Sequence, residues 1–397
     1  MSFPIRQHAL LRGGRGGRVF SVSFGDTASV IGVREDAARG MVADVATGSG
    51  RVRNDFDRIP IFERPIFNAT WDRAARQWIR LTPLGAEGFS WSPVEPYREV
   101  VYRCRPFWYK LDMSGSAAPL WVSVSETPRA GYTLAPMFRD GERCVYRPVF
   151  EMSVGEDGLP HSRAGALPKL AKQGDLMAAA HSYDSAARLE SIKDWFSDML
   201  LLLVEFATWS PGVLMSGNTG TELLKTGTAA MAVTASAGTP AADSACIWRG
   251  KENPWKNACS CLCDILIRRV TQDTGFSATV HYLPDISHYD GTVNAHYRHV
   301  APYVLQTSSY IGVGGFAMGE GFLYPATAVT DGVAAKSYAY LNAPNDTDSP
   351  IAVGVGGSSI HYLLPTDLLP SPFHWEGMQL DAWRSDYLGA RLVLDEA

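Results

Sequence analysis

The sequence predicts an α+β fold in which many short strands surround one long core helix. Three observations predict it. Glycine and proline are abundant, at 37 and 24 of 397 residues, which places turns at short intervals. Short runs that alternate apolar and polar residues, or that are rich in β-branched and aromatic residues, recur along the chain as they do in strands. A single segment, residues 185–207, carries a long apolar stripe at helical spacing.

The predicted strands are distributed from one end of the chain to the other. They cover residues 18–24, two strands within 59–82, and residues 98–101, 120–124, 145–152, 310–316, 335–341, 351–355 and 390–394. Residues 156–182 are polar with glycine and proline, and residues 212–245 are small and polar with little periodicity. We therefore expect loops in these two segments, and long loops in compact domains are often functional.

The helix is predicted to run from Ser185 to Ala207, with Ser185 or Asp184 as its N-cap. Its apolar residues recur every three or four positions and form one wide face, which we interpret as packing on a sheet. Asp194 and Asp198 fall on the opposite face. The helix is expected to stop before Pro211, because proline cannot continue it.

Composition and charge exclude several classes of protein. The net charge of −5 gives no support for attraction to nucleic acid. The short Arg-Gly-Gly tract at residues 12–18 resembles RNA-binding tracts, but only two such units are present, and a flexible or turn-forming lead into the first strand is the favoured interpretation. The N-terminus lacks a long apolar stretch, so we expect no signal peptide. The most apolar run, Met199 to Val204, is far too short to span a bilayer.

Several segments occur in the order of the landmarks of a known family. They are Pro106-Phe-Trp-Tyr109, Leu134-Ala-Pro-Met-Phe-Arg-Asp-Gly141, Tyr146-Arg-Pro-Val-Phe-Glu151, Ser162-Arg-Ala-Gly-Ala-Leu-Pro168, Glu205-Phe-Ala-Thr208, Ser216-Gly-Asn218, Trp248-Arg-Gly-Lys-Glu-Asn-Pro-Trp255, Gly356-Gly-Ser358 and Gly389-Ala-Arg-Leu392. This ordered set resembles phage tail and tail-collar receptor-binding proteins with a C-type-lectin-like fold, which include the variable proteins of diversity-generating retroelements. The chain departs from that pattern at residues 256–264, where the family often has glycine and aromatic residues.

The resemblance implies a domain organisation and a set of scaffold residues. Residues 1–94 would form a small β-rich N-terminal domain for assembly or oligomerisation. Residues 95–397 would form an elaborated C-type-lectin-like ligand-binding domain. The structural signature residues are Trp248, Arg249, Gly250, Glu252, Asn253, Trp255, Gly356, Gly357 and Arg391. We expect Glu252 and Asn253 to anchor loop backbone, with contact to a ligand as the alternative.

The resemblance places a variable binding surface near residues 358–387. The side chains expected to contact ligand are Ser359, His361, Tyr362, His374, Trp375, Gln379, Asp381, Trp383, Arg384, Ser385 and Tyr387. Tyrosine, tryptophan and arginine dominate interface hot spots, because rigid amphipathic rings give contact area at low entropic cost. Packing into the core is the alternative for Trp375 and Trp383. We expect Phe373, Leu380 and Leu388 to lie in the core.

The function implied is host attachment by a phage tail protein. The protein would be made in the bacterial cytoplasm and become part of the virion tail. Its partners would be a host cell-surface protein or glycan, other tail proteins, and further copies of the chain, as a homotrimer. Neither nucleic acid nor membrane insertion is expected. The alternative is a structural tail or collar component that contacts other virion proteins.

An enzyme is the less favoured interpretation, and we expect no catalytic residue, metal or cofactor. Formylglycine-generating enzymes have a related fold and need a reactive cysteine pair near the C-terminus, whereas the last cysteine here is Cys263. The motifs of calcium-dependent sugar binding are also missing from the sequence. Cys259, Cys261 and Cys263 would face one side of a strand, and buried thiols explain them better than a zinc site. His296 and His299 could share a helix face, but polar loop histidines are favoured over metal ligands.

Overall fold

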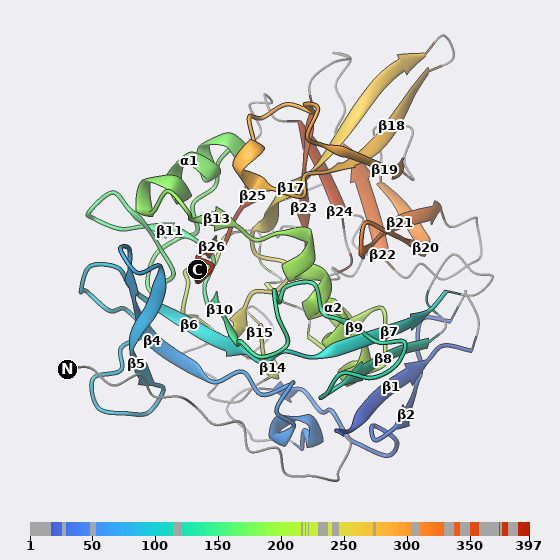
Figure 1. Cartoon of the computed structure of the whole chain (residues 1–397), viewed down its shortest axis with the longest axis horizontal. Coiled ribbons are helices and arrows are strands. Elements are labelled where there is room, and N and C mark those ends of the chain that lie inside the picture. The colour runs from blue at the N-terminus through green and yellow to red at the C-terminus, as the bar shows by residue number, and fades with distance from the viewer. Residues whose placement is uncertain are drawn as a thin grey trace.

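The structure is a computed structural model of the chain. It describes residues 17–25, 29–47, 53–113, 119, 121–215, 217–218, 220, 222–228, 237–239, 246–272, 275–303, 310–328, 337–341, 350–356, 373, 375–379 and 388–397. This part of the chain is strand-rich and carries two α-helices, which confirms the α+β class (Figure 1). None of its helices has the length and apolar character required to cross a membrane.

Two antiparallel sheets are built mainly from the first 150 residues. The five-stranded sheet has the order β2 (Val33–Asp36), β1 (Val19–Ser23), β8 (Trp121–Ser125), β7 (Trp108–Asp112) and β9 (Thr133–Leu134). The four-stranded sheet has the order β10 (Val145–Pro148), β6 (Arg98–Cys104), β4 (Ile66–Asp72) and β5 (Gln77–Pro83). Both sheets therefore join strands from before and after residue 94.

The large sheet lies in the second half of the chain. Its order is β19 (Arg298–Pro302), β18 (Gly275–Tyr282), β17 (Cys259–Gln272), β23 (Ile351–Val355), β24 (Trp375–Gln379), β22 (Ser337–Leu341), β20 (Tyr310–Gly319) and β21 (Phe322–Ala328), and β25 (Leu388–Gly389) also pairs with β17. The central strand β23 is buried at all five positions, as its unbroken apolar sequence requires.

Three small sheets tie distant segments together. They are β16 (Lys251–Glu252), β15 (Ile247–Trp248), β14 (Ala237–Thr239) and β3 (Ala46–Thr47), then β11 (Ser153–Val154) with β12 (Pro160–His161), and β13 (Arg188–Leu189) with β26 (Leu392–Val393). Short 3₁₀ helices occupy Asp55–Arg58, Pro211–Val213 and Ile286–His288. The pairing of β13 with β26 brings the C-terminal residues beside the start of the longer helix.

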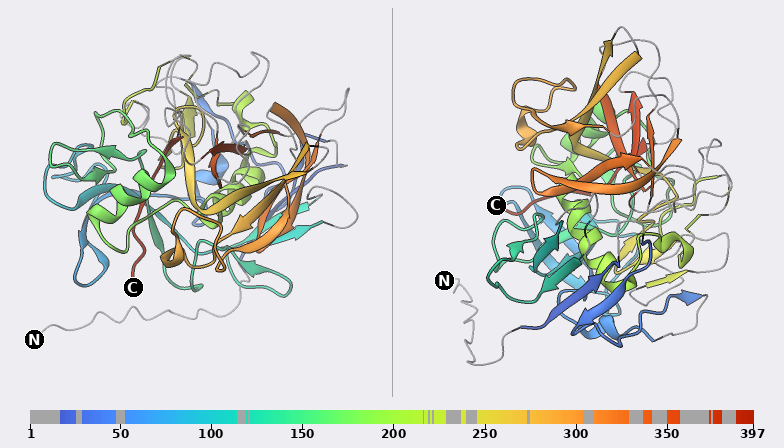
Figure 2. Two further views of the ribbon diagram at one scale, coloured as in Figure 1. Left: turned by 90° about the horizontal axis from the view of Figure 1, so that it is seen from above. Right: turned by 90° about the vertical axis from the view of Figure 1, so that its right-hand side faces the viewer.

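Helix α2 (Ile192–Phe206) lies between the sheets. It packs against β1 and β8 on one side and against β17 and β21 on the other (Figures 1 and 2). All of its residues except Lys193 are buried, so the expectation of a single apolar face was wrong. Asp194 and Asp198 are 2% and 1% exposed, because arginine and lysine side chains neutralise both within the core.

The observed start of α2 differs from the prediction by seven residues, since Ser191 and not Ser185 is the N-cap. The Ser191 hydroxyl oxygen accepts a hydrogen bond from the Asp194 amide, and the Asp194 carboxylate accepts one from the Ser191 amide. This reciprocal capping box fixes the helix start. Asp184, the other predicted cap, instead ends helix α1 (Gln173–Tyr183), which lies in a segment expected to be a loop.

The predicted boundary between residues 94 and 95 does not separate two units. Strand β1 pairs with β8, β4 pairs with β6, and the single bridge Ile31 to Thr208 joins the early chain to the end of α2. Aromatic residues from both sides of the boundary share one hydrophobic core, as Phe24 and Trp209 do at 5.6 Å between ring centroids. The described residues between 17 and 94 are therefore part of the same folded body.

Candidate functional site

The two tryptophans of the segment 248–255 are fully buried. The indole nitrogen of Trp248 donates to the Glu205 carboxylate at 2.9 Å, and that of Trp255 donates to the Met215 carbonyl at 2.8 Å. Each ring therefore has both its apolar area buried and its polar atom satisfied. The segment is fixed at both ends.

Arg249 lies between these tryptophans in the sequence and is completely buried, as is Glu205. Its Nε and Nη2 donate to the two carboxylate oxygens of Glu205 at 2.7 and 2.8 Å, and its Nη1 donates to the Phe62 carbonyl at 3.0 Å. The Asn54 amide donates to the same carboxylate at 2.7 Å. This bidentate pair links the signature segment to helix α2 and to the early chain.

Glu252 and Asn253 anchor backbone and side chains and are 1% and 3% exposed. A Glu252 carboxylate oxygen accepts from the Gly227 main-chain N–H at 2.7 Å, and the side-chain amide of Asn253 donates to the Glu151 carboxylate at 3.1 Å. Burial raises the pKa of Glu151, although Arg391 and three hydrogen-bond donors, two amide side chains and one backbone N–H, oppose the rise. In this arrangement the two residues face the interior.

The other signature residues meet the same segment. Arg391, which is 138 positions after Asn253, donates to the Asn253 carbonyl at 2.9 Å and also to the Glu252 carbonyl. The Gly356 carbonyl accepts from the Lys256 amide at 3.1 Å. A Cβ at Gly356 would lie 3.0 Å from the Pro254 carbonyl oxygen, so glycine is required for this close approach. Gly250 has a positive φ in the turn between β15 and β16. Gly357 lies outside the described residues.

Most residues predicted to contact ligand lie outside the described part of the chain. They are Ser359, His361, Tyr362, His374, Asp381, Trp383, Arg384, Ser385 and Tyr387, and the core prediction Leu380 lies there as well. Gln379 ends strand β24, where it pairs with Ile351. In the sequence, residues 357–372 lie between strands β23 and β24, and residues 380–387 lie between β24 and β25.

Trp375 is in the core and is not part of a displayed surface, which corrects its assignment as a ligand contact. It begins β24, an interior strand, and its side chain is fully buried against Trp195 at 6.1 Å between ring centroids. Phe373 and Leu388 are buried as expected, with Phe373 4.8 Å from Trp209. The aromatic content of residues 358–387 thus serves partly to pack the large sheet on α2.

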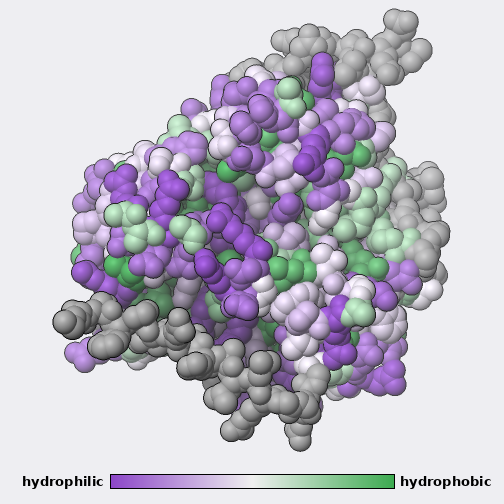
Figure 3. All heavy atoms as spheres, in the orientation of Figure 1, coloured by the Kyte–Doolittle hydropathy of each residue, from purple (hydrophilic) through white to green (hydrophobic). Residues whose placement is uncertain are grey.

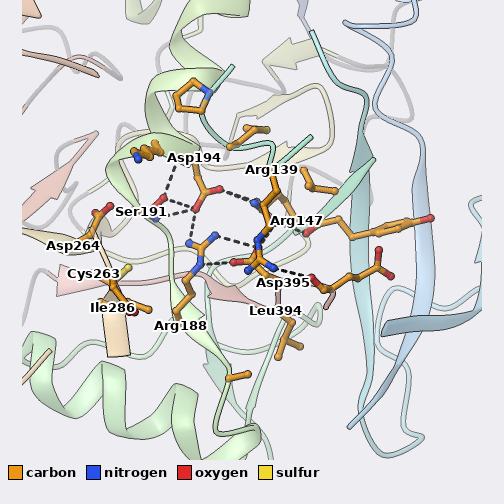
Figure 4. Close-up of a pocket in the computed structure, with 18 of the residues that line it drawn as sticks. Arg139, Arg147, Arg188, Ser191, Asp194, Cys263, Asp264, Ile286, Leu394 and Asp395 are labelled. Carbon is orange, nitrogen blue, oxygen red and sulfur yellow. Dashed lines mark hydrogen bonds and ion pairs between the residues drawn. The ribbon is translucent and has the colours of Figure 1, made fainter. Parts of the chain in front are cut away.

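A polar pocket lies at the N-terminal end of α2 and has a volume of about 510 Å³. Its walls come from the segments 136–147, 186–194, 263–264, 282–286 and 394–397, together with Arg76. Figure 4 shows Arg147 and Arg188 pointing toward Asp194 and Asp395 at its centre. In Figure 3, which has the orientation of Figure 1, hydrophilic residues gather in the middle of the visible face, near the C-terminus.

Four ion pairs fix the floor of this pocket. Arg147 lies 2.7 Å from Asp194 and 3.2 Å from Asp395, and Arg188 lies 2.5 and 2.8 Å from the same two carboxylates. Burial alone would raise the pKa of Asp194, but the two guanidinium groups hold it well below its usual range. Both carboxylates and both guanidinium groups are therefore charged and held in one geometry.

Asp264 lines the same pocket without such a cation partner at short range. Its carboxylate accepts a hydrogen bond from the Ile192 amide in the first turn of α2 at 2.8 Å. Burial raises the pKa of Asp264 to about 7. No sequence pattern indicated this pocket, because its walls come from five separate segments that only the tertiary fold brings together.

The cysteine and histidine residues form no metal centre in the described part of the chain, where no cluster of three or more potential ligands occurs. Cys259, Cys261 and Cys263 lie in β17 and are buried, and the six cysteines form no disulfide. Burial raises the pKa of Cys261 to about 12. His296 stacks on His288 at 3.7 Å between ring centroids, whereas His299 contacts His281 across β18 and β19. His296 and His299 therefore do not share a helix face.

No protein-family model and no curated protein sequence matches the chain.

Proposed function

We propose that the chain is a host-attachment protein of a phage tail, with a C-type-lectin-like scaffold that presents residues 358–387 to a receptor on the bacterial surface. The observation that carries the proposal is the meeting of three separate landmarks. Arg391 donates to the main-chain carbonyls of Glu252 and Asn253. Gly356 accepts from the Lys256 main-chain N–H and lies close to the main chain of Pro254. Segments that matched the landmarks of the family by chance would not be expected to meet around residues 252–256.

The same anchor supports a division of roles between scaffold and binding surface. Gly356 contacts Trp255 directly before residues 357–372. Leu388 and Gly389 pair with Cys259 and Ser260 directly after residues 380–387. A rigid scaffold that fixes the ends of these two chain segments, of which 380–387 carries Trp383, Arg384 and Tyr387, suits a recognition surface. The receptor would be a cell-surface protein or glycan, and other tail proteins and further copies of the chain would be assembly partners.

Capture by whole bacterial cells tests the proposal. The labelled full-length protein is incubated with a panel of bacterial isolates, and the fraction that sediments with cells is measured. We expect capture by particular isolates and its loss in the triple variant His374→Ala, Trp383→Ala, Tyr387→Ala. Trp375 is left unchanged because it is a core residue. A loss of about 100-fold in apparent affinity is expected for two or three hot-spot residues.

The control is a triple variant at exposed apolar residues elsewhere. Ile31, Val33 and Val94 are 77%, 63% and 88% exposed, so their change to alanine removes apolar area without opening the core. Capture should be unchanged in this control. Undiminished capture of the His374, Trp383 and Tyr387 variant would overturn the assignment of the surface. Capture by no isolate, combined with the presence of the protein in purified phage tails, would favour the structural tail component.

A further inference from the structure

We propose that the polar pocket at the N-terminal end of α2 is a second ligand site, which binds a hydroxylated molecule of sugar size that carries one oxyanion group, a carboxylate or a phosphate. No residue of this pocket lies within 358–387. The proposal therefore stands independently of the host-attachment proposal and can fail or succeed separately from it.

The pocket has the volume and the charged side chains to hold a small polar ligand. A volume of about 510 Å³ is in the range in which small-molecule sites are found. Arginine, lysine and aspartate side chains line it together with apolar side chains such as Met137, Leu283 and Ile286. A few polar groups in a partly apolar wall are what orient a small-molecule ligand. The pocket thus has the volume for a small molecule and the polarity for one rich in hydrogen-bonding groups.

The floor presents fixed donors and acceptors side by side. The side chains of Arg147 and Asp194 are each at most 4% exposed and form an ion pair with each other. Arg188 and Asp395, which are 12% and 23% exposed, form a second ion pair beside them. A sugar hydroxyl both donates and accepts hydrogen bonds, so it matches a surface on which guanidinium and carboxylate groups alternate. Because these groups are already paired, they need no reorganisation when the ligand enters.

The rim supplies the groups for the oxyanion. Arg139 and Arg143 are exposed, and each donates from Nη1 to a main-chain oxygen, of Glu396 at 3.2 Å and of Ala397 at 3.0 Å. These contacts hold the side chains at the rim and use one of the five donors of each guanidinium. A planar guanidinium binds carboxylate or phosphate through two parallel hydrogen bonds, and such charge-assisted bonds are the stronger kind.

Two acidic residues of the rim, Asp140 and Asp285, are engaged in their own turns. Asp140 accepts from the amides of Glu142 and Arg143 at 2.9 and 2.8 Å, and Asp285 accepts from the Ser287 amide at 3.0 Å. Asp140 also lies 3.6 Å from Arg143, a distance at which exposed ion pairs contribute little. These two carboxylates are therefore less available to a ligand than the guanidinium groups of Arg139 and Arg143.

Calorimetric titration of the full-length protein tests the proposal. The probes are uronic acids and hexose 6-phosphates of gluco, galacto and manno configuration, the neutral parent hexoses, and inorganic phosphate. We expect at least one anionic sugar to bind about 10-fold more tightly than its neutral parent, since a hydrogen bond to a charged group contributes that much. The uronic acids and the phosphates separate the two sources of the oxyanion.

Two variants and a matched control locate the binding. The double variant Arg139→Gln, Arg143→Gln should lose at least about 10-fold in affinity for the anionic sugar. Arg143→Lys keeps the charge without the planar fork and should lose part of it. The control Arg39→Gln, Arg53→Gln changes two exposed arginines that pair with Glu35 and Asp55 outside the pocket, and should bind as the unchanged protein does.

Four results would overturn the proposal. They are equal binding of the neutral hexoses, binding of inorganic phosphate as tight as that of the sugar phosphates, binding of no probe at millimolar concentration, and unchanged binding in the Arg139 and Arg143 variants with circular dichroism that shows them folded. None of these results bears on capture by cells through residues 358–387, so the two proposals remain distinguishable.

Discussion

Two clusters of arginine and carboxylate in this protein use the same chemistry in opposite surroundings. Around Glu205, Arg249 and its partner are completely buried. In the pocket at the start of α2, exposure rises from the floor, where Asp194 is buried and Asp395 is 23% exposed, to the rim, where Arg143 and Asp140 are 72% and 44% exposed. Removal of one partner from the first cluster strands a charge in the core. The outer arginines of the second cluster are exposed to solvent, so a ligand can bind them at little cost in stability.

The largest expected effect is that of Glu205→Ala, which strips Arg249 of its bidentate partner and Trp248 of its indole acceptor. We expect a loss of about 3–5 kcal/mol in the free energy of unfolding, as for other broken buried pairs. Guanidinium chloride denaturation followed by tryptophan fluorescence measures it. The control Glu35→Ala breaks the exposed pair with Arg39 and should cost at most about 0.5 kcal/mol. Equal losses in the two variants would remove the contrast.

Asp264→Asn is expected to stabilise the protein at alkaline pH. Burial raises the pKa of Asp264 from 3.8 to about 7, so between these values the folded state holds a proton that the unfolded state has released. Stability contributed by this group therefore falls as the pH rises through that range. Asparagine keeps an oxygen to accept from the Ile192 amide. The gain should reach up to about 4 kcal/mol near pH 8 and vanish near pH 4.

Denaturation curves between about pH 4 and pH 8 test this sign. Asp285→Asn is the matched control, because Asp285 lines the same pocket but is exposed, and hydrogen bonds from Ser287 lower its pKa. Its stabilising contribution is present at neutral pH and lost in acid, so its replacement should give no gain near pH 8. A stability profile of Asp264→Asn parallel to that of the unchanged protein would contradict the assignment.

A smaller effect separates close packing from backbone strain. Gly356 and Gly321 share a φ of +87°, but a Cβ at Gly356 would meet the Pro254 carbonyl and Trp255, whereas one at Gly321 would meet nothing within 4 Å. Alanine at Gly321 should cost about 1 kcal/mol in the free energy of unfolding. Alanine at Gly356 should cost about 1–3 kcal/mol more, from overpacking. Equal costs in thermal or chemical denaturation would show that the anchor around Trp255 tolerates the added methyl group.

The smallest effect on stability is expected from the double variant Arg139→Gln, Arg143→Gln. Both side chains are exposed and lie at the rim of the pocket. The free energy of unfolding should change by at most about 0.5 kcal/mol per residue, while ligand affinity falls. A loss comparable to that of Glu205→Ala would mean that these arginines stabilise the fold. The two clusters would then both be structural.

Local sequence patterns predicted the elements whose side chains carry a strong periodic signal. The strands near residues 19–23, 66–83, 98–104, 121–125 and 351–355 lie where the pattern placed them. Helix α1 was missed although Leu176, Ala180 and Tyr183 recur at helical spacing and are buried, because its remaining residues are polar or small. The start of α2 was misplaced because residues 188–189 pair with β26, where the partner of Leu189 is Leu392, 203 positions further along the chain.

The sequence by itself determined the α+β class and the existence of a long core helix, because hydrophobic spacing encodes these properties. It also indicated the burial of Phe373 and Leu388, because large apolar side chains favour the core. The tertiary structure decided that the described residues between 17 and 94 belong to the same body, that Asp194 and Asp198 are interior charges, that Trp375 packs on Trp195, and that five segments close a polar pocket. Each of these depends on partners that lie far apart in the chain, and local periodicity carries no information about which distant segment will supply the partner.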